Sequence, residues 1–167
     1  MAPSKSDNDI FVVIGQGISI WALMEGNLVH IFAMLMGSSV EKSGLVLYSI
    51  INFNVWLTIV TDLFAVHPEL KQFSGAWNKK VGRLRSLNDV RVRLAHHTAL
   101  EHGGFEIGDR TLKPGRNDTR PRSLAHTPLT ADDIDDFAEK VIEINNEIGE
   151  LGHQMGKVLS ADKEKKT

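Results

Sequence analysis

The chain has 167 residues, of which 42% are hydrophobic and 24% charged, as is typical of one globular domain with a hydrophobic core. It contains no cysteine, and this excludes a disulfide framework, a thiolate nucleophile and a cysteine-ligated zinc. The formal net charge of −2 neither favours nor excludes nucleic acid as a ligand, because a local basic patch matters more than the total charge.

The first expected helix runs from Asn8 to Met36 and ends at Gly37. We expect no export signal, because its apolar stretch continues into Gln16 and Glu25 instead of a small-residue cleavage site. A chain without cysteine also fits a reducing compartment, so a cytoplasmic location is expected.

The second expected helix opens at a capping box over residues 38–41 and ends near Val66, where His67-Pro68 interrupts it. Residues 44–61 carry no charge and reach the length of a membrane span. No span is expected, however, because polar residues at helical spacing favour a central helix of a bundle. These polar residues are Asn54, Thr58, Thr61 and Asp62.

The third expected helix begins at Pro68 and ends at Gly103-Gly104. The fourth begins after a capping box formed by residues 130–133 and carries a heptad seam suited to packing in a bundle. The seam residues are Ile134, Phe137, Val141, Ile144, Ile148, Leu151, Met155 and Val158.

Residues 105–128 separate these last two helices and are rich in glycine, proline, asparagine, aspartate and serine. We therefore expect a long basic loop or a small hairpin there. The complete prediction is an all-α, antiparallel four-helix bundle. It forms a single domain over residues 1–167, with flexible ends at about 1–7 and 160–167.

The third helix becomes basic towards its end, where Asp89 is the only acidic residue among six cations. Such a stretch attracts phosphates without reading sequence, which makes Lys80 and Arg83 candidate substrate-binding residues. The alternative is that the acidic fourth helix neutralises the cations inside one bundle. The six cations are Lys79, Lys80, Arg83, Arg85, Arg91 and Arg93.

Arg91 shares the inward stripe of the third helix with Leu84, Leu87 and Leu94. A guanidinium that points along a core needs a counter-charge or a ligand, because an unpaired buried charge is unfavourable. Glu25 and Asp62, lone acids on two apolar helices, are the candidate structural partners, and an anionic ligand is the alternative.

His96 and His97 close this segment, and histidine carries protons near neutral pH. Next to an arginine, such a side chain is suited to phosphodiester cleavage without a metal or another cofactor. The alternatives are a cationic cap at the helix end, or a metal pair of His97 and Glu101.

The string Arg91-Val92-Arg93-Leu94-Ala95-His96 resembles the motif of the HEPN superfamily, an arginine followed four to six residues later by histidine near the end of a bundle helix. These small all-α domains occur in prokaryotic toxins, CRISPR-associated nucleases and many uncharacterised bacterial proteins. The chain departs from the usual motif at Val92, where the family often has asparagine, aspartate or histidine.

The resemblance implies a metal-independent endoribonuclease of toxin or defence type, with Arg91 and His96 as catalytic residues at the cleft of a homodimer. It also implies that Arg93 and His97 bind the RNA backbone, and that an antitoxin or another protein is a partner. Residues five apart lie about 140° apart on a straight helix, so either the helix end bends or a second subunit completes the site. The alternative, favoured by Val92, is a non-catalytic HEPN-like module that binds protein or RNA.

Overall fold

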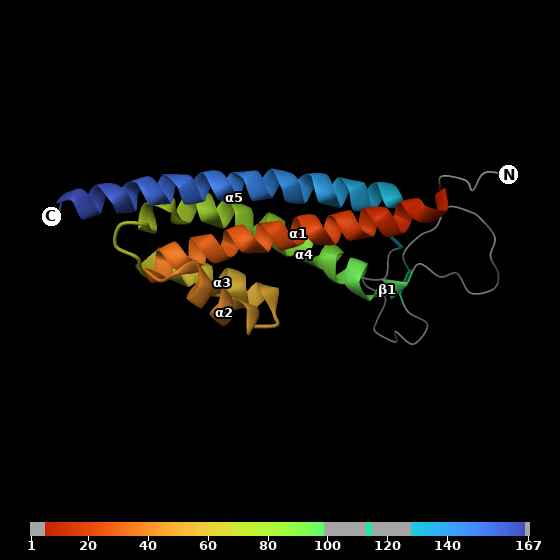
Figure 1. Cartoon of the computed structure of the whole chain (residues 1–167), viewed down its shortest axis with the longest axis horizontal. Coiled ribbons are helices and arrows are strands. Elements are labelled where there is room, and N and C mark those ends of the chain that lie inside the picture. The colour runs from red at the N-terminus through yellow and green to blue at the C-terminus, as the bar shows by residue number, and fades with distance from the viewer. Residues whose placement is uncertain (1–5, 99–112, 115–127, 166–167) are drawn as a thin grey trace. The chain divides into compact units, whose positions relative to one another are not determined.

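The computed structural model describes residues 6–98, 113–114 and 128–165. These residues confirm the all-α fold class, with one pair of two-residue strands besides the helices (Figure 1). The elements in chain order are α1 (Ser6–Met36), α2 (Val40–Tyr48), α3 (Phe53–Val66), η1 (Lys71–Phe73), α4 (Ser74–His96), β1 (His97–Thr98), β2 (Lys113–Pro114) and α5 (Ala131–Lys165).

The chain clusters into two compact units. The first comprises residues 1–22 and 86–141, and the second comprises residues 23–85 and 142–167. Helices α1, α4 and α5 contribute residues to both units, whereas α2, α3 and η1 belong to the second. Three helices run through both units, so this division neither confirms nor contradicts the single domain that the sequence predicts over residues 1–167.

Helix α1 ends as the sequence predicts. Gly37 has a φ of +58°, the left-handed conformation that glycine adopts without a steric penalty. The Gly37 N–H donates to the Met34 carbonyl at 3.2 Å, and the Ser38 N–H donates to the Ala33 carbonyl at 3.0 Å. This pair of hydrogen bonds is the Schellman arrangement, which satisfies the last carbonyls of the helix.

The continuous helix expected up to Val66 is wrong, because the chain breaks between α2 and α3. The Asn52 side chain accepts a hydrogen bond from the Asn54 N–H at 2.9 Å and so starts α3 afresh. The Trp56 indole N–H donates to the Ile50 carbonyl at 2.8 Å and fixes the connection. The capping residue of α2 is Ser39, one position later than its capping box predicts.

Helix α4 begins at Ser74 and not at Pro68, so that expectation is also wrong. The His67 ring accepts a hydrogen bond from the Leu70 N–H at 3.1 Å, which holds the chain in a turn that leads into η1. Helix α4 ends at His96, and His97 begins β1, which pairs antiparallel with β2. Gly103-Gly104 and most of residues 105–128 lie outside the described residues.

Helix α5 begins at the predicted capping box. The Asp133 N–H donates to the Thr130 hydroxyl at 3.1 Å, and the Asp133 carboxylate accepts from the Thr130 N–H at 2.8 Å. The expected seam residues from Ile134 to Met155 are buried, and Val158 is half-buried. The helix continues to Lys165, so residues 160–165, expected to be flexible, are helical.

In the first unit, the aromatic rings of Trp21 on α1 and Phe137 on α5 stack with their centroids 6.1 Å apart. Gly17 lies at this contact, where a Cβ atom would stand in ordinary van der Waals contact, 3.5 Å, with the Phe137 ring. Both tryptophan and phenylalanine are buried, so these rings form the core of the unit.

In the second unit, Trp77 on α4 stacks on Phe64 of α3, with ring centroids 5.6 Å apart. Its indole N–H donates to the Thr61 hydroxyl at 2.8 Å, so the polar stripe of α3 supplies a half-buried hydrogen bond. Other stripe residues, Asn54 and Asp62 among them, are exposed. The stripe therefore does not place α3 at the centre of a bundle.

Helices α1 and α5 run parallel to one another, which contradicts the fully antiparallel arrangement expected from the sequence. Within the second unit, the Asn27 amide donates to the Asn145 side chain at 2.7 Å, and Gly152 approaches Ile31 further along both helices. An up-and-down bundle of four would oppose its first and last helices. The break between α2 and α3 adds one more helix, and thus one more reversal of the chain, before α5.

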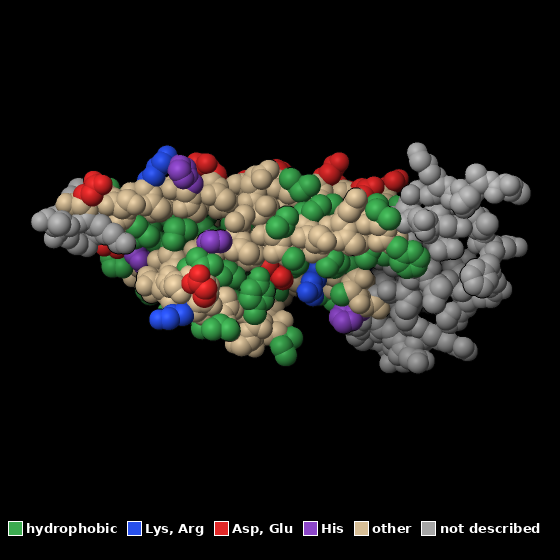
Figure 2. Space-filling model, viewed as in Figure 1, with side chains coloured by type: hydrophobic (Ala, Val, Ile, Leu, Met, Phe, Trp, Pro, Cys, Tyr) green, Lys and Arg blue, Asp and Glu red, His purple; other side chains and the backbone are tan. Residues whose placement is uncertain are grey.

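The α2–α3 region has large apolar side chains on its outside, and Figure 2 shows hydrophobic side chains there. Leu45 is 76% exposed and Ile51 is fully exposed.

Among the described residues, Phe11–Met36 within α1 is long and apolar enough to cross a membrane. The structure buries 44% of its most apolar window, and Trp21 and Leu28 are among the buried residues of α1.

Candidate functional site at the end of helix α4

Lys80 and Arg83, two of the expected substrate-binding residues, are engaged by α5 within the second unit. The Lys80 ammonium donates to the Glu147 carboxylate at 2.6 Å. The Arg83 guanidinium pairs with the same carboxylate and also lies 3.1 Å from Glu143. These contacts correspond to the alternative in which acidic residues of the last helix neutralise the basic stretch.

These contacts shift the pKa values of Glu147 and Arg83 in the directions that favour the charged forms of both. Hydrogen bonds from Lys80, and then from Arg83, lower the pKa of the Glu147 carboxyl. The hydrogen bond to Glu147 raises the pKa of the Arg83 guanidinium. Glu147 thus stays ionised down to more acidic pH than an ordinary glutamate, and two cations share its charge.

Arg91, in the first unit, has a different environment. Its side chain is half-buried beside the leucine stripe of α4, as the sequence predicts. Its Nε atom is shielded from solvent and has no hydrogen-bond partner among the described residues. The expected structural partners, Glu25 and Asp62, belong to the second unit. Asp62 is exposed, and Glu25 lies near Tyr48, whose pKa is raised by burial and, to a smaller extent, by this carboxylate.

His96 occupies the last position of α4, and its side chain is exposed. It follows Arg93 by three residues, so the two side chains lie about 60° apart around the helix. Arg91 and His96 lie about 140° apart by the same geometry. One copy of α4 thus brings His96 together with Arg93 and directs Arg91 elsewhere.

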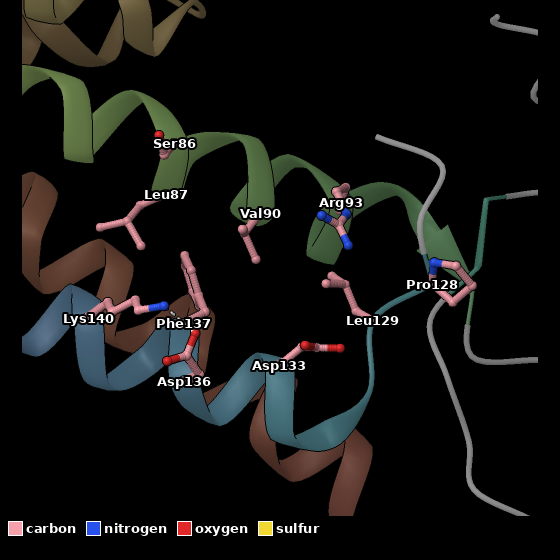
Figure 3. Close-up of a pocket in the computed structure, with 10 residues that line it drawn as sticks. All are labelled: Ser86, Leu87, Val90, Arg93, Pro128, Leu129, Asp133, Asp136, Phe137 and Lys140. Carbon is pink, nitrogen blue, oxygen red and sulfur yellow. Dashed lines mark hydrogen bonds and ion pairs between the residues drawn. The ribbon is translucent and has the colours of Figure 1, made fainter. Parts of the chain in front are cut away.

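A pocket of about 360 Å³ opens on the Arg93 side of α4, between this helix and the beginning of α5 (Figure 3). Leu87, Val90 and Phe137 give it an apolar floor, whereas charged side chains lie around its opening. Its lining residues are Ser86, Leu87, Val90, Arg93, Pro128, Leu129, Asp133, Asp136, Phe137 and Lys140.

Opposite charges face each other in this pocket. Burial lowers the pKa of the Arg93 guanidinium, and the carboxylates of Asp133 and Asp89 oppose that shift. Hydrogen bonds from Thr130 lower the pKa of Asp133, so this carboxylate is ionised at neutral pH. The second pair is an ion pair between Asp136 and Lys140, whose charged atoms lie 2.6 Å apart.

The remaining expected site residues lie partly outside the described residues. The backbone of His97 pairs with Pro114, but its side chain is not described. Glu101, the expected partner in a metal pair, is also outside. In the part of the chain that the structure describes, no three histidine, aspartate or glutamate side chains gather as a metal site would need.

Sequence reasoning missed the pocket, although part of its signal is local. Ser86, Val90 and Arg93 follow one another at steps of four and three, and so do Asp133, Phe137 and Lys140. Two such faces can line one groove, but only the fold shows that they meet. Comparison of the chain with protein-family models, curated proteins and solved structures found no match.

Proposed function

We propose that the chain is a HEPN-like, metal-independent endoribonuclease of toxin or defence type that acts in the cytoplasm as a homodimer. The observation that supports this proposal is Arg91, which is shielded beside the leucine stripe and lacks a hydrogen-bond partner at Nε among the described residues. A half-buried cation without a counter-charge gains most from an anionic ligand. The exposed His96 follows on the same helix end.

The proposed reaction needs only these two groups and the RNA itself. The neutral His96 imidazole takes the proton of a ribose 2′-hydroxyl, whose oxygen then attacks the neighbouring phosphorus atom. The new bond joins the 2′-oxygen to phosphorus, and the bond to the 5′-oxygen breaks. The leaving 5′-oxygen takes a proton from water, and the His96 imidazolium releases its proton to solvent. The products are a 2′,3′-cyclic phosphate and a 5′-hydroxyl. Arg91 stabilises the negative charge that develops on the phosphate oxygens.

A second subunit is part of this proposal because of the angle between the two residues. Arg91 and His96 of one straight helix diverge by about 140° and do not converge on one phosphate. Two copies of α4 related by a twofold axis could instead present Arg91 of one copy beside His96 of the other. An antitoxin or another protein partner would then cover or regulate this cleft.

The test is cleavage of end-labelled single-stranded RNA by the purified chain in the presence of EDTA. We expect cyclic-phosphate ends, and a loss of about 10²–10⁴ in rate for His96→Ala with unchanged helicity by circular dichroism. His153→Ala is the matched control, because His153 is also an exposed histidine and lies on α5. Cleavage that persists in His96→Ala would contradict the proposal and indicate a contaminating nuclease.

A second candidate is a non-catalytic HEPN-like helical module that binds RNA or a protein. Two observations favour it: Val92 occupies the place of the family's usual polar residue, and Glu147 engages Lys80 and Arg83. In the same assay this candidate predicts an RNA complex that Arg91→Ala weakens, with no cleavage in any variant.

A further inference from the structure

The pocket beside Arg93 has the size and lining of a small-ligand site. Its volume of about 360 Å³ lies at the lower end of the range for such sites, roughly 300–1,000 Å³. Leu87 and Phe137 in its floor are buried, whereas Asp133, Asp136 and Lys140 at its opening are exposed. A ligand there would contact apolar surface with its body and charged groups with its edge.

The charges of the lining select against an ionic ligand. Arg93 and Lys140 are balanced by Asp133 and Asp136, and Lys140 is already paired with Asp136. An anion would therefore meet Asp133 and Asp136 as well as the two cations, and a cation would meet Arg93 and Lys140 as well as the two carboxylates. A neutral ligand that carries hydrogen-bond donors and acceptors side by side can use both Arg93 and Asp133, since guanidinium only donates and carboxylate only accepts.

We infer that the pocket holds a nucleobase and prefers guanine. A base is planar and apolar on its faces, which suits the floor formed by Leu87, Val90 and Phe137. Guanine presents a carbonyl acceptor next to N–H donors on one edge, and these match Arg93 and Asp133 respectively. Adenine lacks the carbonyl group, and the pyrimidines cover less of the floor.

The position of the pocket gives this base a place in the proposed reaction. Arg93 and His96 lie about 60° apart and one turn from each other on α4, so the pocket and the proposed general base lie on neighbouring faces of one helix end. The base would belong to the nucleotide whose 2′-hydroxyl attacks. The inference rests on the proposed nuclease function for this role, but nucleobase binding does not depend on it.

The first experiment separates the pocket from catalysis. Saturation-transfer NMR with guanosine, adenosine, cytidine and uridine measures binding of the base without a phosphate. We expect guanosine to bind about tenfold more tightly than the other nucleosides in the wild type. The same ratio is expected in His96→Ala, even if all four bind more weakly, because all four carry the same ribose. Val90→Phe, which fills the pocket, and Arg93→Gln should abolish this preference, whereas Arg85→Gln, an exposed arginine on the same helix, should not.

The second experiment tests the role in cleavage with DNA oligonucleotides that contain one ribonucleotide, carrying each base in turn. We expect cleavage after guanosine to be about tenfold faster. Cleavage without base preference, together with no guanosine binding, overturns the pocket but not the nuclease. Guanosine binding that Val90→Phe and Arg93→Gln reduce, without any cleavage, supports the pocket and contradicts the nuclease. Guanosine binding that neither variant changes overturns the pocket.

Discussion

The two halves of α4 use their cations in different ways. In the second unit, Lys80 and Arg83 are paired with acidic side chains of α5, and Glu147 contacts both. In the first unit, Arg91 is half-buried and lacks a hydrogen-bond partner at Nε among the described residues. Two of the cations on this helix are thus held by carboxylates of α5, whereas the Nε atom of the third has no hydrogen-bond partner in the described part of the chain. Basic composition alone does not distinguish these roles, but the carboxylates opposite each cation do.

The largest expected difference is in RNA cleavage. Arg91→Met should lower the rate by about 10²–10³, the usual effect of removing one group that stabilises transition-state charge. Arg83→Met should leave the cleavage rate within about twofold of the wild-type rate when both proteins are assayed under conditions where they are folded. The reason is that Glu147 already neutralises the Arg83 charge. Cleavage rates of end-labelled RNA in both variants make the comparison. Equal losses would show that the two halves of α4 do not differ in function.

Stability should respond in the opposite way. Glu147→Gln removes the carboxylate shared by Lys80 and Arg83 and leaves Lys80, which is 14% exposed, without its counter-charge. We expect the free energy of unfolding to fall by about 1–2 kcal/mol, with solvent screening of the one-third exposed carboxylate included. Urea denaturation followed by circular dichroism measures this change, and Glu150→Gln, an exposed neighbour on α5, is the control.

The effect of Glu147 should depend on pH with a defined sign. Its pKa is lower in the folded chain than the ordinary value of 4.5, so the folded state favours the ionised form. The stabilisation is then fully present above about pH 4.5 and is lost as the pH falls through the lowered folded-state value. The difference in unfolding free energy between the wild type and Glu147→Gln should be constant from pH 6 to 8 and shrink below 4.5. If this difference in unfolding free energy grew as the pH fell, it would contradict a lowered pKa for Glu147 in the folded chain.

Arg91→Met should be close to neutral for stability. Arg91 is half-buried, and its Nε atom has no hydrogen-bond partner among the residues that the structure describes. An apolar side chain of similar length removes a desolvation cost and retains packing, so a change within about 1 kcal/mol, or a slight gain, is expected. The same denaturation assay applies. A loss as large as that of Glu147→Gln would mean that Arg91 has a structural partner, and it would weaken the case for a ligand.

The smallest expected effect is an increase in the rate of RNA cleavage. Val92→Asn introduces the polar residue usual in the HEPN motif that this segment resembles, and one additional hydrogen bond near the proposed reacting groups would raise the cleavage rate by about fivefold. Val92→Ala is the control for the lost side chain. If neither change alters the rate, the residue after the arginine has no part in this site.

Those parts of the fold that depend on neighbouring residues could be predicted. The Thr130–Asp133 capping box and the end of α1 at Gly37 involve residues three to five apart, and both were expected. The break between α2 and α3 was not predicted, although the buried residues there depart from the spacing of three or four that a continuous helix requires. Leu47 and Phe53 are six residues apart, and the fully exposed Ile51 lies between them.

The roles of individual cations could not be predicted, because they depend on residues far away in the chain. Glu147 lies 67 positions after Lys80, and nothing in local spacing selects this cation over Lys79. The pocket depends in the same way on α5 meeting α4. Sequence reasoning therefore named the basic helix and its histidine, but it could not assign each charge to stability or to binding.

The amide pair between Asn27 and Asn145 determines how α1 and α5 are aligned in the second unit. The α5 seam is almost entirely aliphatic around Asn145, with Ile144 and Ile148 on either side, and such a surface would tolerate sliding by one turn. A slide would separate the two amides, now 2.7 Å apart, and leave each against hydrocarbon. Like a single asparagine in a coiled-coil seam, the pair favours the observed register over one shifted by a turn.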